Sequence, residues 1–308
     1  MMIRNFLFHR VSEEQDSMWP PMTPRLFESI VAKLSKNYYV VPLENFLKEP
    51  AAFKSKGKIA TILFDDGYKD NIEIAAPILK KYNCPASFYI VTDCINRNIP
   101  TWTYILDNIF ANTSTTHLLL EYDFVPKHLK SIPFKISGRS NEVMKQVKPW
   151  MKSLSNTKRL AVLQSIEEQC KDVSTPSGKM MDWKDIKELA TAGFIIGSHS
   201  HTHPMLASLE DKCEIESELK ISGQIIQENL GFFPDTISYP IGSYDRRVMQ
   251  IAQEQGYRFG LAVEQKFYNY NKDNLFSIPR VELYEESKWK TALRMNGLYS
   301  VLKKYAGK

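Results

Sequence analysis

The chain has 308 residues, of which 43% are apolar and 12% aromatic, a composition that suits a globular core and argues against disorder. The net charge is only +5, and basic and acidic residues are mixed along the chain, so nothing indicates binding to nucleic acid. No apolar window approaches the length of a membrane span, and we expect no integral membrane segment.

The N-terminal segment lacks the features of a secretory signal. Only a few apolar residues precede His9, Arg10 and the glutamates that follow. A signal needs a longer apolar core and a small-residue cleavage site. We therefore expect a soluble, cytoplasmic protein, and a chain trimmed of its leader would look similar.

The first part of the chain predicts alternating helices and strands. Thr23 is a plausible N-cap for a helix whose apolar stripe runs from Leu26 to Leu34. The apolar run in KGKIATILFDDG is typical of a strand that is buried on both faces. Further expected elements are a short strand at 38–42, a helix at 71–85 with Pro77 inside it or at a kink, and a strand at 86–91.

The stretch at about 96–180 departs from this alternation. It carries scattered prolines and polar segments between amphipathic helical pieces. We interpret it as a helical insertion within a single domain that spans residues 1–308.

The alternation then resumes towards the C-terminus. We expect a long helix capped by Ser208 and stopped by Gly231. A basic, amphipathic helical tail at about 286–308 is predicted to pack on the exterior, the alternative being contact with an anionic surface. The other expected elements are a helix at 183–193 ended by Gly193, strands at 194–197, within 235–242, at 257–263 and at 276–283, and a helix at 244–256.

This alternation predicts a parallel sheet covered by helices. The sequence contains neither a G-x-G-x-x-G fingerprint nor a Walker motif, which weakens the case for a nucleotide-binding fold. An α/β barrel would place its chemistry at the carboxyl ends of its strands. Polar side chains follow two of the predicted strands in this way.

The first polar group is Asp65 and Asp66, directly before Gly67. Neighbouring residues of a strand point to opposite faces, so both acids can face one site only if the chain turns there, which Gly67 makes easy. By itself, an Asp-Asp-Gly sequence after a strand is also typical of an ordinary turn without a function.

The second polar group is GSHSHTHP, in which His199 and His203 are four residues apart. Within one helical turn this spacing would place both imidazoles on one side, as zinc ligands often are, while His201 would point elsewhere. A lone histidine is more often a core residue whose ring nitrogens are hydrogen-bonded within the fold. Two imidazoles and a carboxylate together favour a metal site with open positions for water and substrate.

The stretches ILFDDGYKDN, IIGSHSHTHPML and ISYPIGSYD resemble, in their order, motifs of the polysaccharide deacetylases of carbohydrate esterase family 4, which share the NodB-homology fold. The resemblance covers roughly residues 1–283. It implies an α/β fold, a distorted (β/α)7-type barrel, with a helical insertion. It also implies an enzyme that removes acetyl groups from N-acetylated, or sometimes O-acetylated, sugars.

The resemblance also implies residue roles. It makes Asp65 the general base and makes Asp66, His199 and His203 the ligands of a divalent metal, zinc first, with cobalt or nickel possible. The backbone N–H of Tyr239 would stabilise the oxyanion. Three side chains match family positions near the site. Trp183 would line the acetyl pocket, pack in the core or do both. Tyr68 would contact the substrate, although its precise role and that of Asp70 stay open.

The chain departs from the family pattern in two places. The arginine that steadies the base is replaced at the equivalent position by Ser238 or Tyr239, and we expect Arg280 to substitute for it, a structural arginine being the alternative. The late histidine that acts as general acid is missing. His9 is the candidate acid, as in the poly-N-acetylglucosamine de-N-acetylases that the chain resembles most, unless His9 is merely structural.

The resulting hypothesis is a metal-dependent de-N-acetylase whose partner is an N-acetylhexosamine-containing glycan or glycan precursor. The alternative is a non-catalytic carbohydrate-binding relative, which would need the metal ligands but not the base Asp65. A phosphoesterase would more often show a second acidic cluster for a second metal, and the sequence shows none. A glycosidase needs two carboxylates that face each other across a sugar, and Asp65 and Asp66 are too close together for that.

Overall fold

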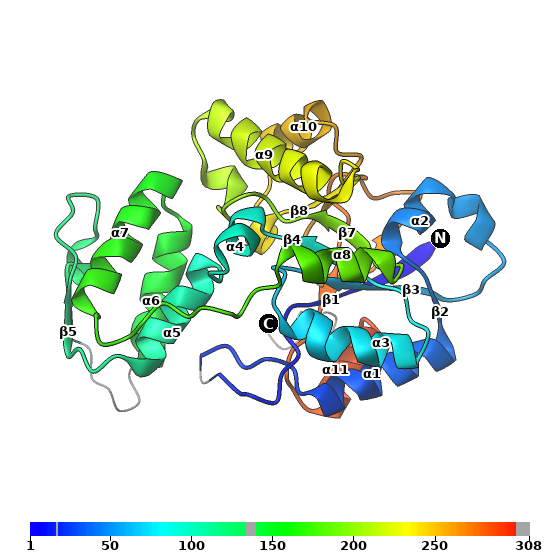
Figure 1. The fold of residues 1–308 in the computed structure, drawn as a ribbon, viewed down its shortest axis with the longest axis horizontal. Coiled ribbons are helices and arrows are strands. Elements are labelled where there is room, and N and C mark those ends of the chain that lie inside the picture. Colours follow the sequence, from blue (N-terminus) through cyan, green and yellow to red (C-terminus); the bar gives the residue numbers. More distant parts are fainter. Residues whose placement is uncertain (17, 134–139, 300–308) are drawn as a thin grey trace.

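The computed structural model describes residues 1–16, 18–133 and 140–299 (Figure 1). Its strands are β1 Met2–Phe8, β2 Tyr39–Val40, β3 Ile59–Phe64, β4 Ser87–Ile90, β5 His117–Leu119, β6 Ser131–Pro133, β7 Ile195–Ser198, β8 Thr236–Ser238, β9 Phe259–Leu261, β10 Tyr268–Asn269 and β11 Val281–Glu282. Its α-helices are α1 Pro24–Asn37, α2 Leu43–Lys48, α3 Ala76–Lys81, α4 Thr92–Arg97, α5 Trp102–Asn112, α6 Ser140–Lys152, α7 Asn156–Gln169, α8 Trp183–Thr191, α9 Lys212–Leu230, α10 Arg246–Glu254 and α11 Lys288–Met295.

The main sheet has the strand order β10-β1-β3-β4-β7-β8-β9 and is parallel from β1 to β9. The segment that contains β11 bridges its two edges, because Ile278 pairs with Leu261 of β9 and Val281 pairs with Phe6 of β1. The sheet is therefore curled, with helices packed around it (Figure 1). The predicted distorted α/β barrel is confirmed.

The face of the curled sheet that packs against α1 carries aromatic side chains in matching register. Phe8 pairs with Phe64, and Phe64 pairs with Phe88, and the rings stack with centroids 5.4 and 4.9 Å apart. All six residues of β3 are buried, as expected for a strand covered on both faces. This register fixes which residues follow the strands side by side: His9 lies next to Asp65, whose N–H donates to the Phe8 carbonyl.

Two helix boundaries illustrate how local chemistry decides an element's start. Thr23 caps α1 as predicted, its hydroxyl accepting from the Leu26 N–H at 3.4 Å. The prediction that Ser208 caps the long helix is wrong. Residues Leu206–Ser208 form a 3-10 turn, and Asp211 caps α9 by accepting from the Cys213 N–H at 2.8 Å.

The stretch before α3 begins with a five-residue π-helix, Asn71–Ala75. Pro77, at the second position of α3, has no N–H to donate, which favours the change of helix type at that point. A π-turn of this kind inside a helical segment often accompanies a functional site. Asn71 itself is fully buried and contacts the site described below.

The insertion between β4 and β7 has its own apolar cluster, to which Leu106, Val147 and Ile166 belong. It contains helices α5, α6 and α7 and also the antiparallel pair β5–β6, so it is not purely helical. In Figure 1 α6 and α7 form a lobe beside the main sheet. The boundaries at about 96–180 and the single-domain interpretation stay predictions.

The predicted tail at about 286–308 begins with α11, and its residues 300–308 lie outside the described part of the chain. Among the helices that the structure describes, none combines the length and the apolar character needed to cross a lipid bilayer.

Candidate active site

The candidate site lies where three parallel strands end. His9 follows β1, Asp65 and Asp66 follow β3, and His199 follows β7. Parallel strands of a barrel present their carboxyl ends at the same face, which brings these residues together. With His203 they line one cavity of about 200 Å³.

The chain turns directly after β3, as the sequence predicts. Asp66 has φ 76° and Gly67 has φ 89°, both in the left-handed region. This turn breaks the alternation of the strand and lets Asp65 and Asp66 point into the same cavity. A Cβ on Gly67 would also lie only 3.1 Å from Cδ1 of Ile95, so the position suits glycine in both respects.

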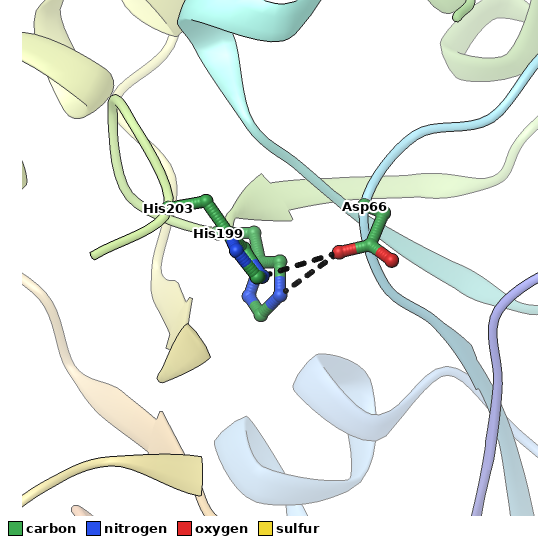
Figure 2. Close-up of side chains that lie close together, drawn as sticks. All are labelled: Asp66, His199 and His203. Carbon is green, nitrogen blue, oxygen red and sulfur yellow. Dashed lines mark ion pairs between the residues drawn. The ribbon is translucent and has the colours of Figure 1, made fainter. Parts of the chain in front are cut away.

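Asp66, His199 and His203 form a compact group of potential metal ligands (Figure 2). Asp66 Oδ1 lies 3.4 Å from Nε2 of each histidine, and the three ligand atoms are all within 4.8 Å of one another. All three side chains are buried. One carboxylate and two imidazoles are a donor set that Zn²⁺ accepts with further positions open.

The segment that carries the two histidines is a loop rather than the helical turn expected from their spacing. Ser200 and His203 have φ values of 66° and 60°, in the left-handed region, which a right-handed helix does not contain. Glu218 of α9 holds the loop by accepting from the N–H groups of His201 at 2.9 Å and Thr202 at 2.8 Å. The side chain of His201 points elsewhere, as predicted: its Nδ1 lies 3.0 Å from the hydroxyl of Thr92.

Both imidazoles can offer the lone pair of a neutral ring to a metal, and the reason differs between them. His199 Nδ1 lies 2.8 Å from the Ser238 carbonyl and donates to it, so in the neutral ring Nε2 has a free lone pair. For His203, burial lowers the pKa to about 3 even though Asp66 acts in the opposite direction. The ring is therefore neutral at neutral pH, which is the form that binds metal.

Asp65 lies beside the ligand group and is held by Arg280. The guanidinium makes two hydrogen bonds to the carboxylate, at 2.8 and 2.9 Å, and the hydroxyl of Ser238 donates at 3.0 Å. Arg280 is fully buried and also donates from Nε to the Ala262 carbonyl. Burial by itself would raise the pKa of Asp65, but Arg280 and then His199 outweigh it, so the pKa is lowered and the carboxylate stays ionised.

His9 lies on the wall of the same cavity. Its Nδ1 is 3.6 Å from Oε1 of Glu282, and its ring packs edge-on against Trp19 with centroids 5.2 Å apart. Asn71 donates to the His9 carbonyl at 2.7 Å. The π-turn before α3 therefore fixes the backbone from which the imidazole projects.

Further side chains complete the cavity wall and, apart from Ile241 in the stretch ISYPIGSYD, the sequence offered no motif that would have found them. Glu282 is the nearest to being predictable, because it lies two residues after Arg280 and so on the same face of a strand. The others come from loops and from the insertion: Trp19, Thr103, Asp107, Lys148, Lys152, Ile241 and Val263.

The prediction that the backbone N–H of Tyr239 faces the substrate is wrong. That N–H donates to the Leu261 carbonyl at 3.1 Å, because β8 continues its pairing with β9 through this residue. The Tyr239 side chain is buried, and its hydroxyl donates to the Phe276 carbonyl at 3.0 Å. Two residues further on, Ile241 lines the cavity with φ 58°.

Of the two roles expected for Trp183, the structure shows core packing, because the side chain packs against the main apolar cluster. Trp183 is not among the residues that line the cavity, and its indole N–H donates to the Asn96 side chain at 2.8 Å. The reason is its position as the first residue of α8, which turns the ring towards α4.

The prediction that Tyr68 binds substrate is also wrong for this cavity. Tyr68 is 1% exposed and packs below the site against Tyr104 and the guanidinium of Arg10. Asp70 has a structural role. Its carboxylate accepts from Arg10 Nε at 3.1 Å and from the Val11 N–H at 3.3 Å, which ties down the segment after His9.

Fold and site together define a class of protein, a NodB-type α/β barrel with a carboxylate–imidazole site at its strand ends. The polysaccharide deacetylase family model matches residues 53–260, more than half of the chain, so the chain belongs to this family. The resemblance to carbohydrate esterase family 4 noted in the sequence is confirmed.

One curated relative is "Putative polysaccharide deacetylase YxkH" of Bacillus subtilis (strain 168). It is 22% identical over 260 residues, which are 84% of this chain and 63% of that protein. The chain therefore spans less than two thirds of the length of this relative.

Solved structures share the fold. The Streptococcus pyogenes deacetylase PplD in complex with acetate aligns with a TM-score of 0.65 at 17% identity, over 96% of this chain and 98% of that chain. IcaB from Ammonifex degensii aligns with a TM-score of 0.62 at 14% identity, over 97% of both chains. A de-N-acetylase from Aggregatibacter actinomycetemcomitans aligns with a TM-score of 0.61 at 17% identity, over 96% of this chain and all 100% of that chain.

Proposed function

We propose that this protein is a metal-dependent hydrolase that removes acetyl groups from the N-acetylated sugars of a polysaccharide or glycan precursor. The observation that carries the proposal is the juxtaposition of two carboxylates with different surroundings. Asp66 faces two imidazoles, whereas Asp65 is paired with Arg280 in the same cavity. Membership of the polysaccharide deacetylase family supports the same activity.

The proposed metal ligands are Asp66, His199 and His203. Their donor set fits a divalent metal, because all three donor atoms converge within 4.8 Å and are buried, and His199 has its second nitrogen engaged. We propose zinc, with cobalt or nickel as substitutes. When bound, such a metal polarises a carbonyl and lowers the pKa of water.

The remaining steps belong to side chains of this chain. Asp65 takes the proton of the attacking water, and Arg280 orients the carboxylate and keeps it ionised. We assign stabilisation of the tetrahedral oxyanion to the N–H of Ile241, a residue that lines the cavity in a left-handed conformation. His9, protonated and paired with Glu282, donates to the leaving amine.

A non-catalytic carbohydrate-binding relative is the second candidate. Such a protein would need the three metal ligands but would have no use for a buried base. Asp65 and Arg280 are nevertheless both buried and are joined by two hydrogen bonds. Because desolvating a carboxylate and a guanidinium is costly, this pair favours an enzyme over a binding protein.

The proposal is tested by measuring acetate release from N-acetylglucosamine oligomers. Metal-free protein should be inactive, and zinc, cobalt or nickel should restore activity. Asp65→Asn should lower kcat by about a thousandfold or more while zinc still binds, since Asp65 is not assigned to the metal. Full activity of Asp65→Asn, or of the metal-free protein, would contradict the proposal.

The assignment of the acid is tested separately with His9→Ala. Loss of a general acid lowers kcat by about 100- to 10,000-fold, and the loss should be smaller for an N-acetylated aryl amine with a good leaving group, which needs less protonation. Equal losses on both substrates, with zinc binding intact, would indicate that His9 is structural.

A further inference from the structure

The insertion contributes one wall of the site, and this wall has no assigned role in the proposed reaction. Helices α5 and α6 place Thr103, Asp107, Lys148 and Lys152 on the cavity that also holds the candidate metal ligands. A segment that only stabilised the fold would have no reason to direct two lysines to this cavity.

The two lysines differ in how their charges are offset. Lys148 Nζ lies 2.6 Å from Oδ2 of Asp107, and both side chains are largely buried, so this pair is neutral overall. Lys152 is half-buried one turn further along α6, and no hydrogen bond or ion pair joins it to any residue in the described ranges. Its amine is therefore the free cation of this wall.

The position of Lys152 is unfavourable without a ligand. Like charges four residues apart on a helix repel each other, and partial burial adds to the cost of the charge. Burial and the charge of Lys148 indeed lower the pKa of Lys152, although Asp107 and Glu282 oppose the shift. An anion bound from solution would offset this cost.

The other charges of the cavity do not supply that anion. Asp65 is neutralised by Arg280, and Asp107 by Lys148. Glu282 faces His9, which is a cation when it acts as the acid. Asp66 belongs to the candidate metal group.

We infer that the sugar bound at this site carries an anionic group, a phosphate or a carboxylate, and that Lys152 binds this group beside the acetamide. The inference rests on the proposed function for the identity of the sugar. Lys152 is then a specificity-determining residue that selects acidic over neutral N-acetylhexosamine substrates. A charge-assisted hydrogen bond of this kind is shorter and stronger than one to a hydroxyl group.

The first test compares kcat/KM for acetate release from three substrates: a neutral N-acetylglucosamine oligomer, N-acetylglucosamine 1-phosphate, and an oligomer that alternates N-acetylglucosamine with glucuronate. One acidic substrate should exceed the neutral oligomer in the wild type, and which of the two does so identifies phosphate or carboxylate as the source. Lys152→Met should lower the acidic-to-neutral ratio by about tenfold or more, and Lys152→Arg should retain most of it.

Lys145→Met is the matched control, because Lys145 is exposed on the same helix and is not among the cavity residues. It should leave the ratio unchanged. An unchanged ratio in Lys152→Met, with acetate still released, would overturn the inference and leave the proposed function standing.

Calorimetric binding of the same three sugars to wild type, Lys152→Met and Lys145→Met separates the two proposals further. Tighter binding of an acidic sugar that is lost only in Lys152→Met supports the anion site even if no acetate is released, and in that case the proposed function alone fails. Equal binding of acidic and neutral sugars by wild type overturns the inference.

Discussion

The most demanding contact in the site is between Asp65 and Arg280, which lie 215 residues apart in the sequence and form two hydrogen bonds in the interior. Their partners are also internal: Ser238 donates to the carboxylate, and the Ala262 carbonyl accepts from Arg280. A buried ion pair contributes little net stability by itself. Its value in the proposed reaction is chemical, since it keeps a buried carboxylate ionised for use as a base.

We predict that Arg280→Met is strongly destabilising, by about 3–5 kcal/mol, because it leaves the charge of Asp65 buried without a partner. Asp65→Asn in the same chain should recover much of that loss. Urea unfolding of the two single variants and the double variant measures this coupling. Additive losses would indicate that the two side chains do not depend on each other.

The histidines proposed as ligands should make metal binding depend on pH. Burial by itself would lower the pKa of His199, but Asp65 and Asp66 outweigh it, so the pKa lies above the usual 6.5 and, below that raised pKa, Nε2 carries a proton in the metal-free site. Metal must displace this proton. Zinc affinity should therefore fall as the pH decreases through the raised pKa, and binding below that pKa should release about one proton.

Calorimetric zinc titrations in buffers of different ionisation enthalpy measure the proton release. His201→Ala is the control, because this ring points away from the ligand group and should not change the number of protons. Zinc binding that releases no proton at any pH down to 5 would contradict the assignment of His199 as a ligand.

Among the elements, the loop after β7 depends on a helix that contributes no side chain to the cavity. Glu218 of α9 is mostly buried and accepts from two successive N–H groups of the loop and from the Thr202 hydroxyl. Its carboxylate replaces the hydrogen bonds that a regular element would have given to this backbone. The left-handed conformation of Ser200 and His203 is maintained in this way.

We predict that Glu218→Ala weakens zinc binding by about tenfold or more, since residues that position metal ligands typically have effects of this size. Glu216→Ala is a suitable control, because Glu216 lies on the same helix and pairs with Lys212 at its exposed end. Competition with a chromophoric chelator measures the affinities. Equal affinities of the two variants would show that the loop does not need Glu218.

At the scale of the whole molecule, the site joins segments that the curled sheet brings together from both ends of the chain. Arg280 and Glu282 lie on the segment that bridges β9 to β1, and His9 follows β1. A metal that ties β3 to the loop after β7 would therefore stabilise the closed arrangement as a whole. Binding to the folded state alone adds to the free energy of unfolding.

We predict that zinc stabilises the wild type by about 2.7 kcal/mol when its free concentration is about a hundred times the dissociation constant. His203→Ala should lose this increment, because it removes a ligand from a buried site. Denaturant unfolding with zinc and with a chelator gives the difference. A similar increment in His203→Ala would mean that zinc binds elsewhere.

Several features of this protein could be predicted from the sequence alone, because short-range patterns carry them. The apolar run of β3 and the alternation of elements predicted the parallel α/β fold. The turn at Asp66 and Gly67 followed from local chain geometry. The grouping of Asp66 with His199 and His203 followed from the family motifs, and the structure brings these three side chains together.

Tertiary structure alone decided the rest. The sequence could not show that β8 uses the N–H of Tyr239 for pairing, that the first residue of α8 turns Trp183 away from the cavity, or that α6 brings Lys152 to its wall. The physical reason is that local sequence specifies which groups a segment offers. Only the packing of distant segments determines whether such a group is hydrogen-bonded or packed within the fold, or faces the cavity.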